Sequence, residues 1–139
     1  MTSFRERGRR GETEIRRLLK KHFFVFVHGL STPGVDIVAI KKDLAVFLEV
    51  KSTTKDEFRV PVSQIQELYR AAEEFSEKVG IPCKCYIIVK FVGKGYVIVE
   101  PPAEYDKKYY VIKPNKVLTR RQLLECILSQ KIHDIYNNK

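Results

Sequence analysis

Two acidic residues and a lysine lie within two apolar stretches of the chain. Asp36 is in the first stretch, and Glu49 and Lys51 end the second. Both stretches are apolar at successive positions, which is typical of strands covered on both faces. Charged side chains are costly in such strands unless they pair with each other or with a cation. These three residues are therefore the first candidates for a chemical role.

The spacing of the two stretches predicts that the charged residues meet. If residues 42–43 form the turn of a hairpin, counting along the ladder places Asp36 directly opposite Glu49. Directly opposite residues share a face of the sheet, with Cβ atoms about 5 Å apart. Lys51 lies two residues beyond Glu49, so it emerges on that same face.

Two carboxylates this close call for a cation between them. Oxygen ligands favour Mg²⁺, with Mn²⁺ as a substitute, over zinc. Such an ion binds phosphate, lowers the pKa of a bound water and stabilises charge that develops on phosphorus oxygens. Lys51 would orient the attacking water or hold a phosphate oxygen. The alternative is an ordinary surface salt bridge between Lys51 and either acid.

The charge of the chain indicates a polyanionic partner. Its 139 residues carry 26 Lys and Arg against 17 Asp and Glu, a net charge of +9. Small basic domains bind nucleic acid by releasing condensed counterions, although charge can also serve solubility alone. Arg5, Arg9 and Arg10 lie on a predicted N-terminal helix, either facing phosphates or forming a solvated surface.

The remaining pattern predicts one α/β domain over residues 1–139. Helices are expected to begin near three residues, of which the first and last have capping-box spacing: Ser3, Ser63 and Thr119. Strands are expected at residues 23–27, 35–40, 44–50, 85–92, 96–99 and 109–112. The order α-β-β-β-α-β-β-β-α indicates a central mixed β-sheet flanked by helices.

Glycines and cysteines give further expectations. Gly8 and Gly11 continue the apolar stripe of the first helix and would weaken it unless another element approaches closely. Cys83, Cys85 and Cys126 are too scattered for a disulfide framework, so buried thiols in a reducing compartment are expected. The first two are expected on opposite faces of their strand. No apolar run reaches the length of a membrane span, so a cytoplasmic, nucleoid-associated protein is expected.

The chain resembles the PD-(D/E)xK nuclease superfamily, and within it the archaeal Holliday junction resolvases. The resemblance covers nearly the whole chain and is carried by these segments: Gly8 with Glu12, Pro33-Gly34-Val35-Asp36, Glu49-Val50-Lys51-Ser52, Gly80-Ile81-Pro82 and Val89-Lys90-Phe91. It implies a restriction-endonuclease-like core. It also implies a homodimer that binds four-way DNA junctions by shape and nicks two opposing strands symmetrically with Mg²⁺, in DNA recombination and repair.

The resemblance assigns roles at the predicted metal site. Asp36 and Glu49 would be metal ligands, joined by the Val50 carbonyl, and Lys51 would be the catalytic lysine. Glu12 would reach the site from the first helix as a further acidic ligand and catalytic residue. An ordinary surface role for Glu12 is the alternative.

The resemblance also assigns DNA contacts. Residues 29–35 would form a DNA-contacting loop with Ser31 or Thr32 as its polar catalytic residue. Thr13 and His28 stand where such resolvases usually carry arginine, so the DNA contacts are expected to differ from those of the family. His28 is a candidate for phosphate contact.

Two further basic residues follow the predicted catalytic strand. Lys55 and Arg59 can face DNA or serve solubility.

Two other functions compete with junction resolution. One is a repair or restriction-type nuclease on the same core, which the lack of an obvious base-reading insertion in 139 residues disfavours. The other is a basic DNA-binding protein that does not cut. The presence of Asp36, Glu49 and Lys51 together disfavours that reading.

Overall fold

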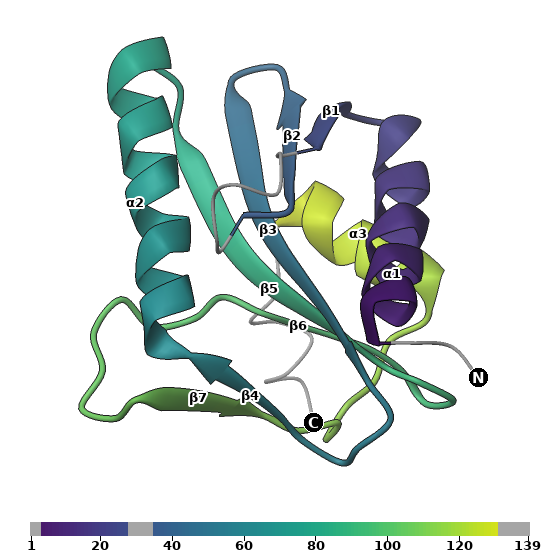
Figure 1. Cartoon of the computed structure of the whole chain (residues 1–139). Helices are drawn as coiled ribbons and strands as arrows, with labels where there is room; N and C mark the ends of the chain where they lie inside the picture. Colours follow the sequence, from purple (N-terminus) through teal and green to yellow (C-terminus); the bar gives the residue numbers. More distant parts are fainter. Residues whose placement is uncertain (1–3, 28–34, 131–139) are drawn as a thin grey trace.

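The computed structural model describes residues 4–27 and 35–130, with side chains over residues 11–26 and 35–130. Its helices are α1 (Phe4–Lys20), α2 (Val62–Val79) and α3 (Arg120–Ser129). Its strands are β1 (Phe24–Val27), β2 (Ile37–Lys41), β3 (Leu44–Thr53), β4 (Phe58–Pro61), β5 (Cys83–Phe91), β6 (Gly95–Val99) and β7 (Tyr109–Ile112). Figure 1 shows their arrangement.

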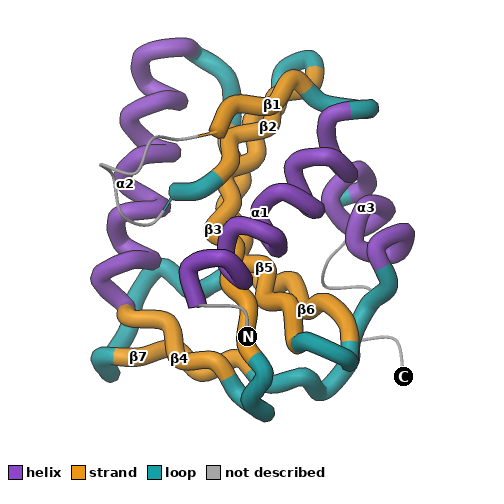
Figure 2. Tube along the Cα trace, turned by 45° about the vertical axis from the view of Figure 1, so that its right-hand side comes forward, coloured by secondary structure: helices purple, strands orange, loops and turns teal. Residues whose placement is uncertain are grey.

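The central sheet is mixed, as predicted. Its strand order is β1-β2-β3-β5-β6, with β3 and β5 parallel and the other neighbouring pairs antiparallel. α2 covers one face, and α1 and α3 cover the other (Figures 1 and 2). β4 and β7 form a separate two-stranded sheet, from which the chain enters α2 directly. Among the helices of the described residues, none has the length and apolarity that crossing a membrane requires.

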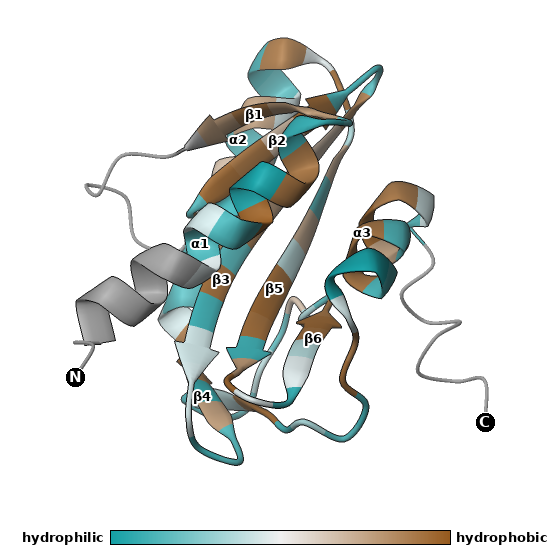
Figure 3. Cartoon of the chain, turned by 90° about the vertical axis from the view of Figure 1, so that its right-hand side faces the viewer, coloured by the Kyte–Doolittle hydropathy of each residue, from teal (hydrophilic) through white to brown (hydrophobic). Residues whose placement is uncertain are grey.

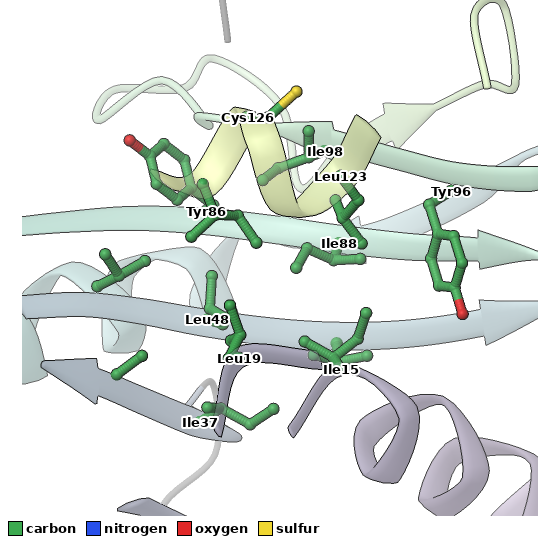
Figure 4. Packing of buried hydrophobic residues seen from close by; sticks show 14 of the residues in the cluster. Ile15, Leu19, Ile37, Leu48, Tyr86, Ile88, Tyr96, Ile98, Leu123 and Cys126 are labelled. Carbon is green, nitrogen blue, oxygen red and sulfur yellow. The ribbon is translucent and has the colours of Figure 1, made fainter. Parts of the chain in front are cut away.

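Alternation along the central strands builds a core on each face of the sheet. On one face, Ile15 of α1 and Leu123 of α3 belong to the same buried cluster as Leu48 of β3 (Figure 4). On the other face, Leu68 of α2 packs in a cluster with Phe47 of β3. Burial on both sides explains why β3 is apolar at successive positions. Toward its end β3 becomes hydrophilic (Figure 3).

Two helix ends follow the predicted signals. α2 ends at Gly80, which adopts the left-handed conformation with φ of 84°. α3 begins after Thr119, whose hydroxyl accepts the N–H of Gln122 while the Gln122 side chain accepts the N–H of Thr119. The proposed cap at Ser3 lies outside the described residues.

Three predictions need correction. β4 was not predicted, because four residues ending in Pro61 give a weak local signal and only pairing with β7 makes them a strand. β3 continues to Thr53 rather than ending at Val50. Cys83 and Cys85 share a face and pack in the α2-side core, because residues two apart on a strand point the same way. All three cysteines carry free thiols, as expected, and Cys83 is only partly buried.

Candidate active site

The predicted register of the β2–β3 hairpin is confirmed. Lys41 pairs with Leu44, and the ladder continues to Ile37 opposite Leu48. Asp36 is the residue just before β2, and its N–H donates to the Leu48 carbonyl at 2.9 Å. If the ladder is continued by one more pair, Asp36 lies opposite Glu49, as the sequence predicted.

The Asp36 carboxylate is fastened to the neighbouring strand. Its Oδ2 accepts a hydrogen bond from the backbone N–H of Val50 at 2.7 Å. Burial raises the pKa of Asp36 above its ordinary value, while this N–H and the charge of Lys51 act in the opposite direction. The hydrogen bond fixes the carboxylate beside the segment that carries the other candidate residues.

Glu49 is a buried acid with one unsatisfied oxygen. The residue is 4% exposed. Its Oε1 lies 2.7 Å from Nζ of Lys51, but Oε2 is buried and finds no hydrogen-bond donor among the described residues. Burial raises the pKa of Glu49, the charge of Asp36 raises it further, and Lys51 opposes both. A buried carboxylate oxygen without a donor requires an explanation, and a cation would supply one.

Glu12 brings a third acid to this place from α1. Its side chain is partly buried, and burial raises its pKa. The charge of Asp36 raises the pKa of Glu12 further, and Arg16 opposes this. Glu12 in turn raises the pKa of Glu49. The three carboxylates therefore lie within electrostatic reach of one another.

The edge of the sheet explains how α1 reaches this point. β2 begins opposite Leu48, so residues 49–53 of β3 pair with β5 but not with β2. α1 approaches β3 closely there, because a Cβ built on Gly11 would lie 3.9 Å from both Ser52 Cβ and Val50 Cγ1. Gly11 therefore lies against β3, although a Cβ at this position would make only ordinary contacts, whereas Gly8 lies outside the described side chains.

The donor set fits a hard divalent cation. All of the candidate ligands are oxygens, which Mg²⁺ and Mn²⁺ prefer. Over residues 11–26 and 35–130, no three His, Cys, Asp or Glu side chains form a group that could hold a metal ion by themselves. An ion here would therefore combine the carboxylates of Asp36 and Glu49 with main-chain oxygen or water, as Mg²⁺ commonly does.

Comparison with known proteins decides the family. Residues 3–132 match the sequence profile of the archaeal Holliday junction resolvases. The chain belongs to this family. A curated relative, the crossover junction endodeoxyribonuclease Hjc of Methanocaldococcus jannaschii, is 30% identical over 106 residues, which cover 76% of this chain and 75% of the relative.

A solved resolvase has the same fold. Hjc of Archaeoglobus fulgidus, described as a Holliday junction resolvase from an archaeal hyperthermophile, matches with a TM-score of 0.61 at 18% identity. The match covers 85% of this chain and 95% of that chain. The predictions of an α/β fold with a mixed sheet, of the resolvase family and of a nuclease are thus confirmed.

Several of the catalytic and DNA-binding roles predicted for this chain remain predictions. His28, Ser31 and Thr32 lie outside the described residues. Arg5, Arg9 and Arg10 belong to α1, where only the backbone is described.

Lys55 and Arg59 lie on the surface beyond the end of β3. Lys55 is exposed in the turn, where its N–H donates to Thr53 Oγ1 at 3.1 Å. The Arg59 side chain is 65% exposed, and its Nε lies 3.9 Å from Glu57 Oε1. Both side chains are therefore accessible to a ligand, but they are not part of the acidic site.

Sequence reasoning missed a second polar group beneath α1. Glu14 interacts with Lys90 of β5 and Tyr96 of β6. Lys90 was noted only as part of the segment similar to the resolvases. The strand periodicity places Lys90 and Tyr96 on the α1 face, but no local pattern shows that α1 brings an acid to them.

Proposed function

We propose that this chain resolves four-way DNA junctions by hydrolysing one phosphodiester bond in each of two opposing strands, at a site formed by Glu12, Asp36, Glu49 and Lys51. The observation that supports this site best is the buried Glu49 Oε2, which lacks a donor among the described residues and lies beside a second carboxylate. A structural ion pair with Lys51 would leave no reason for this second acid.

The chain's own residues have distinct tasks in this proposal. Asp36, Glu49 and the Val50 carbonyl would hold Mg²⁺, for which Mn²⁺ would substitute. When bound, the ion supplies a Lewis acid that lowers the pKa of water and neutralises charge on the phosphate. The Val50 N–H keeps Asp36 oriented. Lys51, two residues from Glu49 on the same face, donates to a phosphate oxygen or to the attacking water.

Glu12, the third acid, would add an oxygen to the ion's surroundings, directly or through a bound water. Glu12 lies at the edge of the group with a raised pKa, and it can hold or release a proton of the attacking water. Ser31 or Thr32 would contribute a hydroxyl from the neighbouring loop.

Substrate selection would depend on charge and symmetry. A net charge of +9 favours binding to several phosphates, for which Arg5, Arg9, Arg10, His28, Lys55 and Arg59 are the candidates. A four-way junction has two equivalent strands to cut, so a homodimer with two-fold symmetry would present one site to each. Such an enzyme would act on chromosomal DNA in the nucleoid.

The proposal is tested with an immobile four-way junction, a linear duplex and a flap DNA, each with and without Mg²⁺. The parent should make paired symmetrical nicks in the junction only when the ion is present. Asp36→Asn and Glu49→Gln should abolish cutting but retain junction binding, because phosphate contacts elsewhere dominate affinity. Asp56→Asn, which removes an exposed carboxylate paired with Lys94, is the matched control and should cut normally.

Three results would contradict the proposal. Cutting by Asp36→Asn at the parental rate would remove that residue from the site. Equal cutting of all three DNAs would favour a nuclease without junction selectivity. Junction binding without any cutting by the parent would favour a DNA-binding protein.

A further inference from the structure

A group of hydrogen-bonded side chains fastens α1 to strands β5 and β6. Both carboxylate oxygens of Glu14 accept from Nζ of Lys90, at 2.8 and 2.9 Å, and Oε2 also accepts from the Tyr96 hydroxyl. Nζ of Lys90 lies 6.0 Å from the centre of the Tyr96 ring. Tyr96 is 4% exposed, and its hydroxyl points toward α1 in Figure 4. We call Glu14, Lys90 and Tyr96 the α1 clamp.

The residues of the α1 clamp on β5 and β6 lie at the same level of the sheet as the catalytic end of β3. Lys90 pairs with Tyr96 between β5 and β6, and with Ser52 between β3 and β5. Ser52 is next to Lys51 and is one of the two residues that Gly11 approaches. The row from Ser52 through Lys90 to Tyr96 therefore crosses the sheet beneath α1, at the level of the active site.

Helix geometry places Glu12 and Glu14 on opposite sides of α1. Gly11 and Ile15 are both buried, so the line between them faces the sheet. At about 100° per residue, Glu12 lies about 80° to one side of that line and Glu14 about 80° to the other. Glu12 is directed toward the acids, and Glu14 toward Lys90 and Tyr96. Rotation of α1 about its axis would therefore move both glutamates together.

Two features leave the rotation of α1 poorly fixed by its other contacts. Gly11 has no side chain that could pack against β3 and so fix the rotation of α1. The like charges of Glu12 and Asp36 also repel each other, and this repulsion would turn Glu12 away from the site. The hydrogen bonds of Glu14 with Lys90 and Tyr96 on the other side of the helix hold one rotational setting, because a turn in either direction would lengthen or compress them. Removing a hydrogen bond of the α1 clamp should therefore displace Glu12 without unfolding the protein.

We propose that the α1 clamp fixes the rotation of α1 and thereby holds Glu12 at the active site. This inference rests on the role proposed above for Glu12. Glu14, Lys90 and Tyr96 are positioning residues, since they act through α1 and lie outside the acidic group.

The test is a double-mutant cycle between Tyr96→Phe and Glu12→Gln. Tyr96→Phe removes only the hydroxyl that Glu14 accepts and keeps the buried ring. Tyr86→Phe is the matched control, because its hydroxyl bonds Oε1 of Gln130 at 2.9 Å on the same face of the sheet. The measurements are the single-turnover rate of junction cutting, Mn²⁺ binding by calorimetry without DNA, and junction affinity without a divalent cation.

We expect Tyr96→Phe to slow cutting roughly 3- to 10-fold, as small misplacements of catalytic groups do. Mn²⁺ binding should weaken as well, and junction affinity should not change. In the Glu12→Gln background, Tyr96→Phe should cause no further loss of rate or of Mn²⁺ affinity. Tyr86→Phe should keep both values near those of the parent.

Other results overturn the inference in distinguishable ways. If the two losses multiply in the double variant, Tyr96 acts independently of Glu12 and the α1 clamp does not position it. A parental rate and parental Mn²⁺ affinity for Tyr96→Phe would have the same meaning. If Glu12→Gln itself cuts normally, the role proposed for Glu12 is wrong and the inference fails with it. Loss of cutting in Asp36→Asn would still stand in that case.

Discussion

The variant Glu49→Gln separates a catalytic acid from a structural ion pair by its effect on stability. If the Glu49–Lys51 pair is structural, its loss leaves Lys51 without its partner and destabilises the protein. If Glu49 is a metal ligand, the metal-free protein keeps a carboxylate buried beside a second acid at the expense of stability. Replacing it with the neutral amide should then stabilise the protein.

We expect the free energy of unfolding to rise by roughly 1 kcal/mol, because active sites commonly contain groups that lower stability. The Glu49 side chain is 5% exposed, so the amide removes the desolvation of a buried charge and its repulsion by Asp36. The lost attraction to Lys51 is smaller, because that side chain is 25% exposed and water screens it. In a chain of this size the gain corresponds to a rise in Tm of about 3–5 °C.

The sign depends on pH. A carboxyl group whose pKa is raised by folding begins to reduce stability as the pH rises through its ordinary pKa, and the reduction is complete above the folded pKa. The advantage of Glu49→Gln should therefore be absent below the ordinary glutamate pKa of 4.5 and grow as the pH rises above it.

The assay is thermal unfolding of the metal-free protein across this pH range. Glu74→Gln is the control, because its pair with Lys78 is exposed and screened by water, so its loss should leave the Tm nearly unchanged. A large fall in the Tm of Glu49→Gln at neutral pH, with Glu74→Gln unchanged, would show that the acid stabilises the fold and would refute the reasoning.

Three further predictions follow from the same site. Lys51→Ala should slow single-turnover cutting roughly 10²-fold with junction affinity unchanged, and a rate within a few-fold of the parent would exclude an electrostatic role for Lys51. Gly11→Ala should fold and cut normally, because its Cβ would make ordinary 3.9 Å contacts, whereas Gly11→Leu should push α1 from β3 and slow cutting; equal rates would contradict the close approach. The Mg²⁺ concentration for half-maximal cutting should rise as the pH is lowered, because protons compete for carboxylates of raised pKa, and a constant midpoint would argue against metal ligation by them.

The active-site hairpin was predictable because its information is local. A two-residue turn and strict alternation sufficed to align Asp36 with Glu49, and the observed ladder follows that register. The caps at Gly80 and Thr119 were equally local, since each depends on residues within one helical turn.

What sequence reasoning missed depends on contacts between distant segments. β4 exists only through pairing with β7, far along the chain. The bond from the Val50 N–H to Asp36 depends on β2 beginning at Ile37, two residues later than predicted, so that Asp36 lies before the strand rather than within it. Glu14 and Tyr96 meet only because α1 crosses the sheet, and neither has a sequence neighbour that indicates the other.

The hairpin between β2 and β3 turns in two residues, with Lys42 at a positive φ of 55°. Unless a bulge absorbed it, one inserted residue there would slide one strand past the other by a single step and carry Asp36 to the opposite surface of the sheet. The spacing of this turn, which contains no candidate catalytic group, therefore decides whether the acids converge. We expect homologues that cut junctions to vary hardly at all in the number of these turn residues.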